Sequence, residues 1–327
     1  MAKLILFTGK GGVGKSTTSA ATALNFSKQG YKTLLVSSDP AHSTEDVVGV
    51  QVGFTPTLIS ENFYAKNINS EFRAKQFMEQ LSDGLDKSVN KWFPGFDVEL
   101  LSDWASFPGM DEVFALEELL HLVRGIEYDL IVFDTAPTGH TLKALTAPDN
   151  IKEMLLKIRR MKKKIAGKLL KGIVFKGSDT DELEELLATS CDELDELKAF
   201  LQDEERTKIM LVSIPTEAGF MEFYRTINFL KSIDLPTDTL IVNHIVPDMG
   251  PHFEARGDNP AVAMVWSEHQ NQKQWIHNYQ KVCQEHEVKV IGVTRLPYEP
   301  KGLGDTGHLK DFADLIIGTN KMELPGE

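Results

Sequence analysis

The segment from Gly9 to Ser16 reads Gly-Lys-Gly-Gly-Val-Gly-Lys-Ser and fits the phosphate-binding pattern G-x-x-x-x-G-K-[ST]. It lies between an apolar run suited to a buried strand and a run suited to a helix, which is the context that the pattern requires. Glycines let backbone N–H groups converge on a phosphate, and the following helix directs its positive N-terminal end at the same anion. The segment therefore predicts a site for the phosphates of a nucleotide.

The side chains of this loop predict separate roles. We expect Lys15 to reach the β- and γ-phosphates of ATP, Ser16 to bind Mg²⁺ and Thr17 to contact the α-phosphate. Lys10 is a second lysine that the general pattern does not require, and its charge would lie where negative charge develops during hydrolysis. The alternative for Lys10 is an ordinary solvated lysine. The backbone cradle consists of Gly9, Gly11, Gly12, Val13 and Gly14.

Two aspartates follow apolar runs elsewhere in the chain. Asp39 lies in the segment 38–43, and Asp134 begins the segment 134–142. Because ligands bind at the carboxyl ends of parallel strands, we expect both carboxylates beside the phosphate loop. One carboxylate can hold Mg²⁺ through water while the other orients the attacking water. Taken alone, each aspartate would be better explained as a helix cap, so the prediction depends on their combination with the loop.

Short apolar runs rich in Val, Ile and Leu recur along the chain, each followed by a turn signal. Helical stretches such as Ser16–Gln29 and Glu217–Ser232 separate them. Alternation of buried strands with helices predicts an α/β fold with a doubly wound, mostly parallel sheet and right-handed crossovers. The predicted strands are Leu4–Phe7, Thr33–Val36, Leu130–Phe133, Ile209–Ile214, Leu240–Val242 and Val288–Val293.

Two regions do not follow this alternation. Residues 70–122 are rich in helix formers, and residues 150–205 carry apolar residues at the three- and four-residue spacing of amphipathic helices. We expect these regions to form one α-helical subdomain, inserted in two pieces into a nucleotide-binding core. That core would consist of residues 1–69, 123–149 and 206–327.

The composition limits the possible partners. A net charge of −13 argues against a general nucleic-acid surface, which needs a basic balance. Cys191 and Cys283 are too few for a disulfide framework or a four-cysteine metal site, so we expect a reducing, cytoplasmic setting. No apolar stretch approaches the length that spans a bilayer.

The loop with its two lysines resembles the deviant phosphate loop of dimeric ATPases. These include the nitrogenase iron protein, the septum-site and partition ATPases, and the arsenite-pump and tail-anchored-protein-targeting family. The sequences D-P-A-H-S at 39–43 and D-T-A-P-T-G-H-T at 134–141 are similar to switch I and switch II of that last family. The resemblance implies a homodimer in which Lys10 reaches the partner's nucleotide. It also implies that Asp39 positions or activates water and that Asp134 holds the Mg²⁺ shell.

Later segments extend this resemblance over most of residues 1–320. Asn243 matches an asparagine that reads adenine, and Glu217 matches a glutamate that faces the partner's nucleotide. Pro297 and Tyr298 lie in a segment similar to the loop that closes over the base. The resemblance therefore implies contacts from these four residues to the nucleotide.

The chain also departs from the family. Targeting members carry a Cys-x-x-Cys pair that shares zinc across the dimer, whereas residues 265–270 read Val-Trp-Ser-Glu-His-Gln. We therefore predict no structural zinc. Arsenite-pump members gather thiols in the helical region, whereas Cys191 is alone there.

Three functions follow from the resemblance. The first is a homodimeric Mg-ATPase whose nucleotide-driven closure binds or delivers hydrophobic segments of tail-anchored membrane proteins, in contact with a membrane receptor or channel. The second is an ATPase that drives an efflux pump for arsenite or another anion. The third is a regulatory ATPase of the partition type, which the switch sequences disfavour. A hydrophobic groove and a filled helical core remain alternatives for the helical subdomain.

Overall fold

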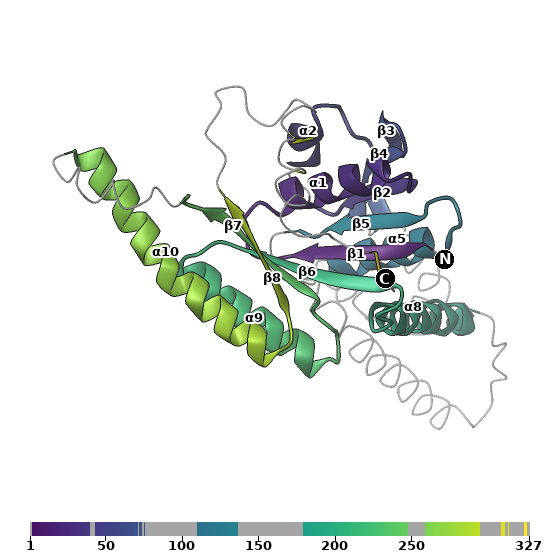
Figure 1. Ribbon diagram of the computed structural model, residues 1–327. Coiled ribbons are helices and arrows are strands. Elements are labelled where there is room, and N and C mark those ends of the chain that lie inside the picture. The colour runs from purple at the N-terminus through teal and green to yellow at the C-terminus, as the bar shows by residue number, and fades with distance from the viewer. Residues whose placement is uncertain are drawn as a thin grey trace, which may run out of the picture. The chain divides into compact units, whose positions relative to one another are not determined.

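The computed structural model describes five main stretches of the chain (Figure 1). The chain divides into two compact units, one of residues 1–68, 122–139 and 201–327 and the other of residues 69–121 and 140–200. Predictions for residues 76–109, 137–178 and 295–308 lie outside the described residues. The described stretches are 2–39, 43–70, 110–136, 179–247 and 259–294, with isolated residues at 72, 73, 75, 309, 310, 313, 324 and 325.

An eight-stranded sheet forms the first unit, in the order β3-β4-β2-β5-β1-β6-β7-β8. Every neighbouring pair is parallel except β3 with β4, which is antiparallel. The predicted α/β fold with a mostly parallel sheet is therefore confirmed. The strands are β1 (Lys3–Thr8), β2 (Thr33–Ser37), β3 (Thr57–Ser60), β4 (Phe63–Asn67), β5 (Leu130–Asp134), β6 (Thr207–Ser213), β7 (Thr239–Ile245) and β8 (Lys289–Thr294).

The described helices of the first unit connect these strands. They are α1 (Lys15–Lys28), α2 (Ser43–Val48), α9 (Glu217–Ser232) and α10 (Pro260–Glu285). Because β2 and β7 lie on opposite sides of β1, right-handed crossovers place α1 and α9 on opposite faces of the sheet. Helix α10 lies beside α9 and also contacts β7 and β8 (Figure 1). Two further helices, α5 (Met110–Arg124) and α8 (Asp179–Leu201), belong largely to the second unit.

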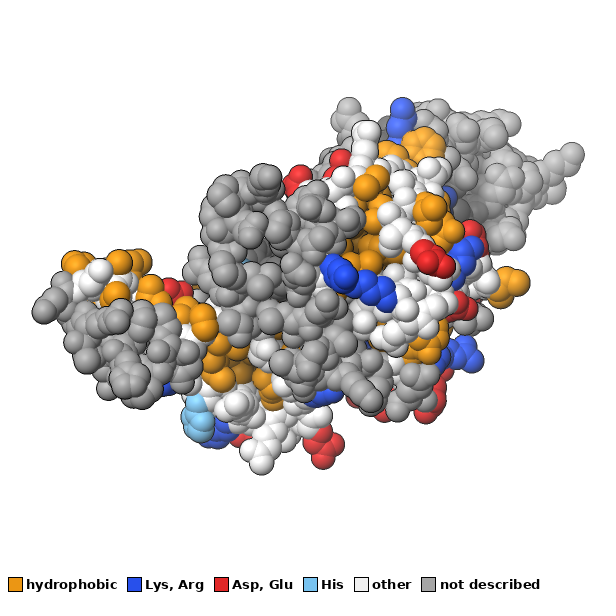
Figure 2. All heavy atoms as spheres, turned by 45° about the horizontal axis from the view of Figure 1, so that its top comes forward, with side chains coloured by type: hydrophobic (Ala, Val, Ile, Leu, Met, Phe, Trp, Pro, Cys, Tyr) orange, Lys and Arg blue, Asp and Glu red, His pale blue; other side chains and the backbone are white. Residues whose placement is uncertain are grey.

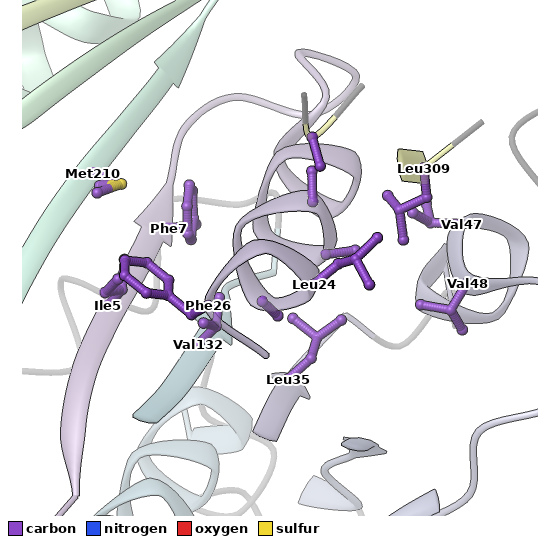
Figure 3. Close-up of a cluster of buried hydrophobic side chains, with 14 of the residues drawn as sticks. Ile5, Phe7, Leu24, Phe26, Leu35, Val47, Val48, Val132, Met210 and Leu309 are labelled. Carbon is purple, nitrogen blue, oxygen red and sulfur yellow. The ribbon is translucent and has the colours of Figure 1, made fainter. Parts of the chain in front are cut away.

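The hydrophobic core fixes α1 against the sheet. Figure 3 shows Leu24 and Phe26 of α1 close to Leu35 of β2 and Val132 of β5. Small residues on α1, such as Ala20, pack into the same cluster and allow the helix to approach the strands closely. Because α1 begins at Lys15, this packing also fixes where the phosphate loop ends.

The sheet contains two strands that the sequence analysis did not predict. Strand β3 is only partly buried along its length, so it lacks the continuous apolar run of a central strand. Strand β4 is buried but ends in Lys66 and Asn67, which interrupt its apolar pattern. The apolar pattern is weak in this segment because β3 lies at the edge of the sheet, where polar residues are tolerated, and because its neighbour β4 ends in two polar residues.

Several predicted boundaries were wrong by one or two residues, and one long helix was missed. Strand β6 begins at Thr207 and ends at Ser213, and α1 begins at Lys15 instead of Ser16. The unpredicted helix α10 begins with an Asn259 cap, whose side-chain oxygen accepts from the N–H of Ala261 at 3.0 Å. Its long polar stretches gave no clear apolar stripe in the sequence.

The beginning of α10 projects beyond α9 and exposes apolar side chains. Met264 is 74% exposed, and the neighbouring Val265 and Trp266 are also exposed. Figure 2 shows hydrophobic side chains on the surface of this projecting part. Among the helices that the structure describes, none has the length and apolar character needed to cross a membrane.

Candidate functional site

The register of the sheet brings the predicted site residues to one edge. Phe7 of β1 and Ser37 of β2 both pair with Asp134 of β5. The residues that follow β1 and β2, the phosphate loop and Asp39, therefore leave the sheet next to Asp134. The structure thus places the loop and both predicted aspartates together at the carboxyl ends of the central strands.

Two glycines of the phosphate loop are required by close backbone packing. A Cβ atom on Gly9 would collide with the carbonyl oxygen of Val212 on β6. A Cβ atom on Gly14 would collide with the side-chain amide of Asn243, and Gly14 has a φ of +92°. Gly12, at φ +78°, has open space around it, while Gly11 is exposed. The loop is therefore pressed against β6 and Asn243 and open toward solvent at its middle.

The start of α1 is suited to an anion. Its N-cap, Gly14, makes no side-chain capping bond, and the first turn carries no acidic residue. The Thr18 hydroxyl donates to the carbonyl oxygen of Gly14 at 2.6 Å, so this carbonyl is directed toward the helix. Ser16 and Thr17 are half-buried on this first turn. The uncapped N–H groups and the glycine cradle fit a phosphate group.

Lys15 is buried beneath the loop, with 6% of its surface exposed. Its Nζ donates to the carbonyl oxygen of Lys10 at 3.3 Å. Burial lowers the pKa of Lys15, while the negative charges of Asp134 and Asp39 act in the opposite direction. Lys15 thus interacts electrostatically with both predicted aspartates, whereas the side chain of Lys10 is exposed.

Asp134 is a buried carboxyl group, only 1% exposed. Burial raises its pKa to about 6; the Ser16 side chain and the charge of Lys15 lower it in part, and Asp39 raises it further. Both carboxylate oxygens are shielded from solvent, and neither makes a hydrogen bond of standard geometry within the described part of the chain. Such oxygens, next to a serine hydroxyl, fit the oxygen ligands that Mg²⁺ prefers.

Among the described residues, no cage of protein ligands surrounds Asp134. Within the described stretches, no three His, Cys, Asp or Glu side chains come close enough together to hold a metal ion. A Mg²⁺ ion that used Ser16 and Asp134 would therefore complete its shell with phosphate oxygens and water, as this ion commonly does.

Ser38 connects the two switch segments, a role that the sequence analysis did not assign. Its N–H donates to the carbonyl of Asp134 at 3.1 Å, and its hydroxyl accepts from the N–H of Ala136 at 3.1 Å. The neighbouring Asp39 donates its N–H to the hydroxyl of Ser37 at 3.2 Å. The two bonds of Ser38 join residues almost a hundred positions apart. The only signal for them in the sequence was a side-chain hydroxyl that follows a strand end.

The remaining predicted contacts are placed less completely. Asn243 is buried, and its Nδ2 donates to the carbonyl of Val13 at 3.0 Å, so its amide touches the phosphate loop. Glu217 is exposed on the first turn of α9 and lines a cavity of about 460 Å³ against α10. The structure gives no contact from Glu217 to the phosphate loop among the described residues. Pro297 and Tyr298 lie outside the described residues.

A family model described as "Anion-transporting ATPase" matches residues 2–317. The chain belongs to this family. The resemblance inferred from the phosphate loop and the two switch segments is therefore confirmed.

Several relatives share this similarity, and each is named an ATPase. "ATPase ARSA1" of Chlamydomonas reinhardtii is 33% identical over 77% of this chain, and "Putative arsenical pump-driving ATPase" of Chlorobaculum tepidum is 32% identical over 75%. "ATPase get3" of Botryotinia fuckeliana is 27% identical over 96% of this chain and 89% of its own length. The matches span only 36% of the Chlamydomonas protein and 61% of the Chlorobaculum protein.

Substitution of Gly9 tests the packing of the loop in this family member. We expect Gly9→Ala to lower the free energy of unfolding by about 2 kcal/mol or more, because the new Cβ meets a fixed backbone carbonyl. Gly12→Ala is the matched control, since it adds only the strain of a positive φ, about 1 kcal/mol. Urea unfolding of both variants measures the difference; equal losses would contradict the packing of Gly9 on Val212.

The pH dependence of stability tests the burial of Asp134. The unfolded chain releases this proton near its usual pKa of 3.8, but the folded protein holds it to about pH 6. Stability of the Mg²⁺-free and nucleotide-free protein therefore falls as pH rises through this window and stays lower above it, by roughly 3 kcal/mol. We expect Asp134→Asn to remove this loss, so that the variant is the more stable protein above pH 6.

Unfolding in urea across this pH range, with EDTA present, measures the effect. Asp192→Asn, at an exposed aspartate, serves as the control and should keep the wild-type profile. A constant difference between Asp134→Asn and wild type at every pH would show that Asp134 does not titrate as a buried acid.

Proposed function

We propose that the protein is a Mg-ATP-dependent homodimeric ATPase whose nucleotide-driven switch controls the binding of hydrophobic membrane-protein segments. One observation supports ATP hydrolysis: the buried side chains of Lys15 and Asp134 interact electrostatically next to the phosphate loop, and both also interact with Asp39. Membership of a family whose members are named ATPases supports the same activity.

The residues divide the chemistry among themselves. Lys15 binds the β- and γ-phosphates, and its bond to the Lys10 carbonyl is exchanged for bonds to phosphate oxygens. Ser16 and Asp134 would hold Mg²⁺, which would neutralise phosphate charge when bound. Asp39 orients the attacking water, and Asn243 contacts the adenine base. Ser38 ties Asp39 to Asp134, so that the two switch segments respond together.

Two exposed features support a dimer. The side chain of Lys10 is exposed in the single chain, which leaves it available to a nucleotide on a second protomer. The projecting end of α10 exposes Met264, Val265 and Trp266, and apolar surface of this kind is covered in assemblies. Residues 265–270 carry no cysteine that could share a zinc ion across the dimer. In the proposed dimer, this apolar surface joins the two protomers instead.

The thiols favour the membrane-segment function over an arsenite pump. Cys191 and Cys283 are both buried, and burial raises the pKa of Cys283 to about 12. As(III) binds thiolates, which the Cys283 thiol does not readily supply, and Cys191 is buried. Two cysteines that form no disulfide also suit the reducing cytoplasm.

Mixing two inactive variants tests whether Lys10 acts across a dimer. We expect Lys10→Ala and Asp39→Asn each to lose most of their ATPase activity. In a mixed dimer, however, one site combines an intact Asp39 with the partner's intact Lys10. Random pairing of equal amounts should then restore about one quarter of wild-type activity. Steady-state phosphate release measures this recovery.

The control mixes Asp39→Asn with Lys15→Ala, which both change the protomer that binds the nucleotide. Every site of that mixed dimer lacks either Asp39 or Lys15, so activity should stay low. If the Lys10→Ala and Asp39→Asn mixture also stays inactive although a mixed dimer is isolated, Lys10 does not act across the interface.

A trapped variant tests the client. We expect Asp39→Asn with Mg-ATP to co-purify with a protein that carries one C-terminal transmembrane helix, because ATP binds without hydrolysis. A client with two aspartates in that helix is the control and should not co-purify.

Arsenite should leave the ATPase activity of wild type and Cys191→Ser unchanged. Stimulation by arsenite that Cys191→Ser abolishes would favour the pump instead.

A further inference from the structure

Gln272 of α10 forms hydrogen bonds with the backbone just beyond Asn243. It is buried, with 5% of its surface exposed, although it is a polar residue in the middle of a helix. Its Oε1 accepts from the N–H of Val246 at 2.8 Å, and its Nε2 donates to the carbonyl of His244 at 3.2 Å. A single side-chain amide thus satisfies two backbone groups on either side of Ile245, as a neighbouring strand would.

The backbone that Gln272 binds, from His244 to Val246, is irregular. The pairing register between β7 and β8 shifts between Val242 and Ile245, so regular ladder bonds are interrupted there. His244 has a φ of +60°, a left-handed conformation that costs a non-glycine residue roughly 1–2 kcal/mol. Such a conformation persists only where its surroundings hold it. Gln272 supplies two of the bonds that hold it.

The left-handed turn at His244 sets the orientation of the Asn243 amide. The N–H of His244 donates to Asn243 Oδ1 at 2.9 Å, while Asn243 Nδ2 donates to the carbonyl of Val13 at 3.0 Å. These two bonds distinguish the oxygen from the nitrogen of the amide and prevent its reversal. One lone pair of Oδ1 and one N–H of Nδ2 remain for a ligand, in a fixed order.

A fixed order of acceptor and donor discriminates between purines. Adenine presents an amino donor beside a ring-nitrogen acceptor, whereas guanine presents a carbonyl acceptor beside an N–H donor. An amide held in one orientation matches one of these edges and opposes the other. If the amide can reverse, it matches both.

We infer that Gln272 is a positioning residue that fixes the Asn243 amide and thereby gives the site its preference for adenine over guanine nucleotides. Gln272 acts through His244 and Asn243. The inference rests on the proposed function, in which ATP binds and Asn243 contacts its base. It adds a residue on α10, outside the strand that carries Asn243, that determines which base is accepted.

The test compares the preference for ATP over GTP, measured as the ratio of their kcat/KM values, in full-length variants. We expect Gln272→Ala to lower this ratio about tenfold, the effect of one hydrogen bond to the base. The change should come mainly from KM, because the phosphate loop and Asp39 are untouched. Gln274→Ala, at an exposed glutamine on the same helix, should keep the wild-type ratio.

Gln272→Glu is a second variant, in case Gln272→Ala does not fold. A glutamate still accepts from Val246 N–H but, when ionised, cannot donate to the His244 carbonyl, so we expect a lowered ratio here too. A lowered melting temperature with an unchanged ATP/GTP ratio in either folded variant would show a purely structural role and overturn the inference.

Asn243→Ala separates failure of this inference from failure of the proposed function. If Asn243→Ala lowers the ATP/GTP ratio while both Gln272 variants keep it, Asn243 reads the base without help from Gln272. If Asn243→Ala leaves the ratio unchanged, Asn243 does not read the base, and the proposed base contact fails together with the inference built on it.

Discussion

The burial of two opposite charges at one edge of the sheet is the constraint on which the site depends. Lys15 and Asp134 are 6% and 1% exposed, and desolvation moves the pKa of each toward its neutral form. Their mutual attraction offsets these shifts only in part. A ligand that brings phosphate oxygens to Lys15 and a divalent cation to Asp134 stabilises both charged forms. Part of the cost of charge burial, incurred in folding, is therefore recovered on binding.

The fold keeps these charges in place through apolar packing. Strands β1 and β5 are buried along their whole length apart from Lys3, and α1 packs on them through small and apolar residues. Because Phe7 and Ser37 both pair with Asp134, three strand ends meet where the charges lie. A shift of register in any of these pairs would exchange the side chains that pack on the two covered faces of the sheet and so disrupt the close packing of the core. The core thus fixes the site more firmly than the loop bonds alone.

The sequence was informative where one physical signal dominated. Central strands buried on both faces require Val, Ile and Leu runs, so six strands were predicted, five of them within two residues at each end. The predicted end of β7, at Val242, is three residues short of the observed end at Ile245. The edge strand β3 was missed because partial exposure removes that signal. Helix α10 was missed because much of its length is solvent-exposed and polar, so that local periodicity says little about it.

Within the site, local patterns predicted residue types but not their partners. The glycine loop and Asp134 are recognisable from neighbouring residues in the chain. The bond of Asn243 to Val13 joins positions 230 residues apart, and the two bonds of Ser38 cross between strands. Such contacts depend on strand order, which no local window contains.

The same long-range bonds connect the phosphate loop to α10. Gly9 packs on Val212, and the next residue, Ser213, shares a 2.7 Å hydrogen bond with Tyr279 of α10. The Tyr279 hydroxyl in turn donates to the carbonyl of Ile214 at 2.9 Å. On β7, Asn243 contacts the loop while Gln272 holds the segment that follows. The ends of β6 and β7 therefore contact both the phosphate loop and α10. In the proposed function, a nucleotide that binds two loop geometries unequally would therefore also favour one position of α10, whose projecting end carries the exposed apolar surface.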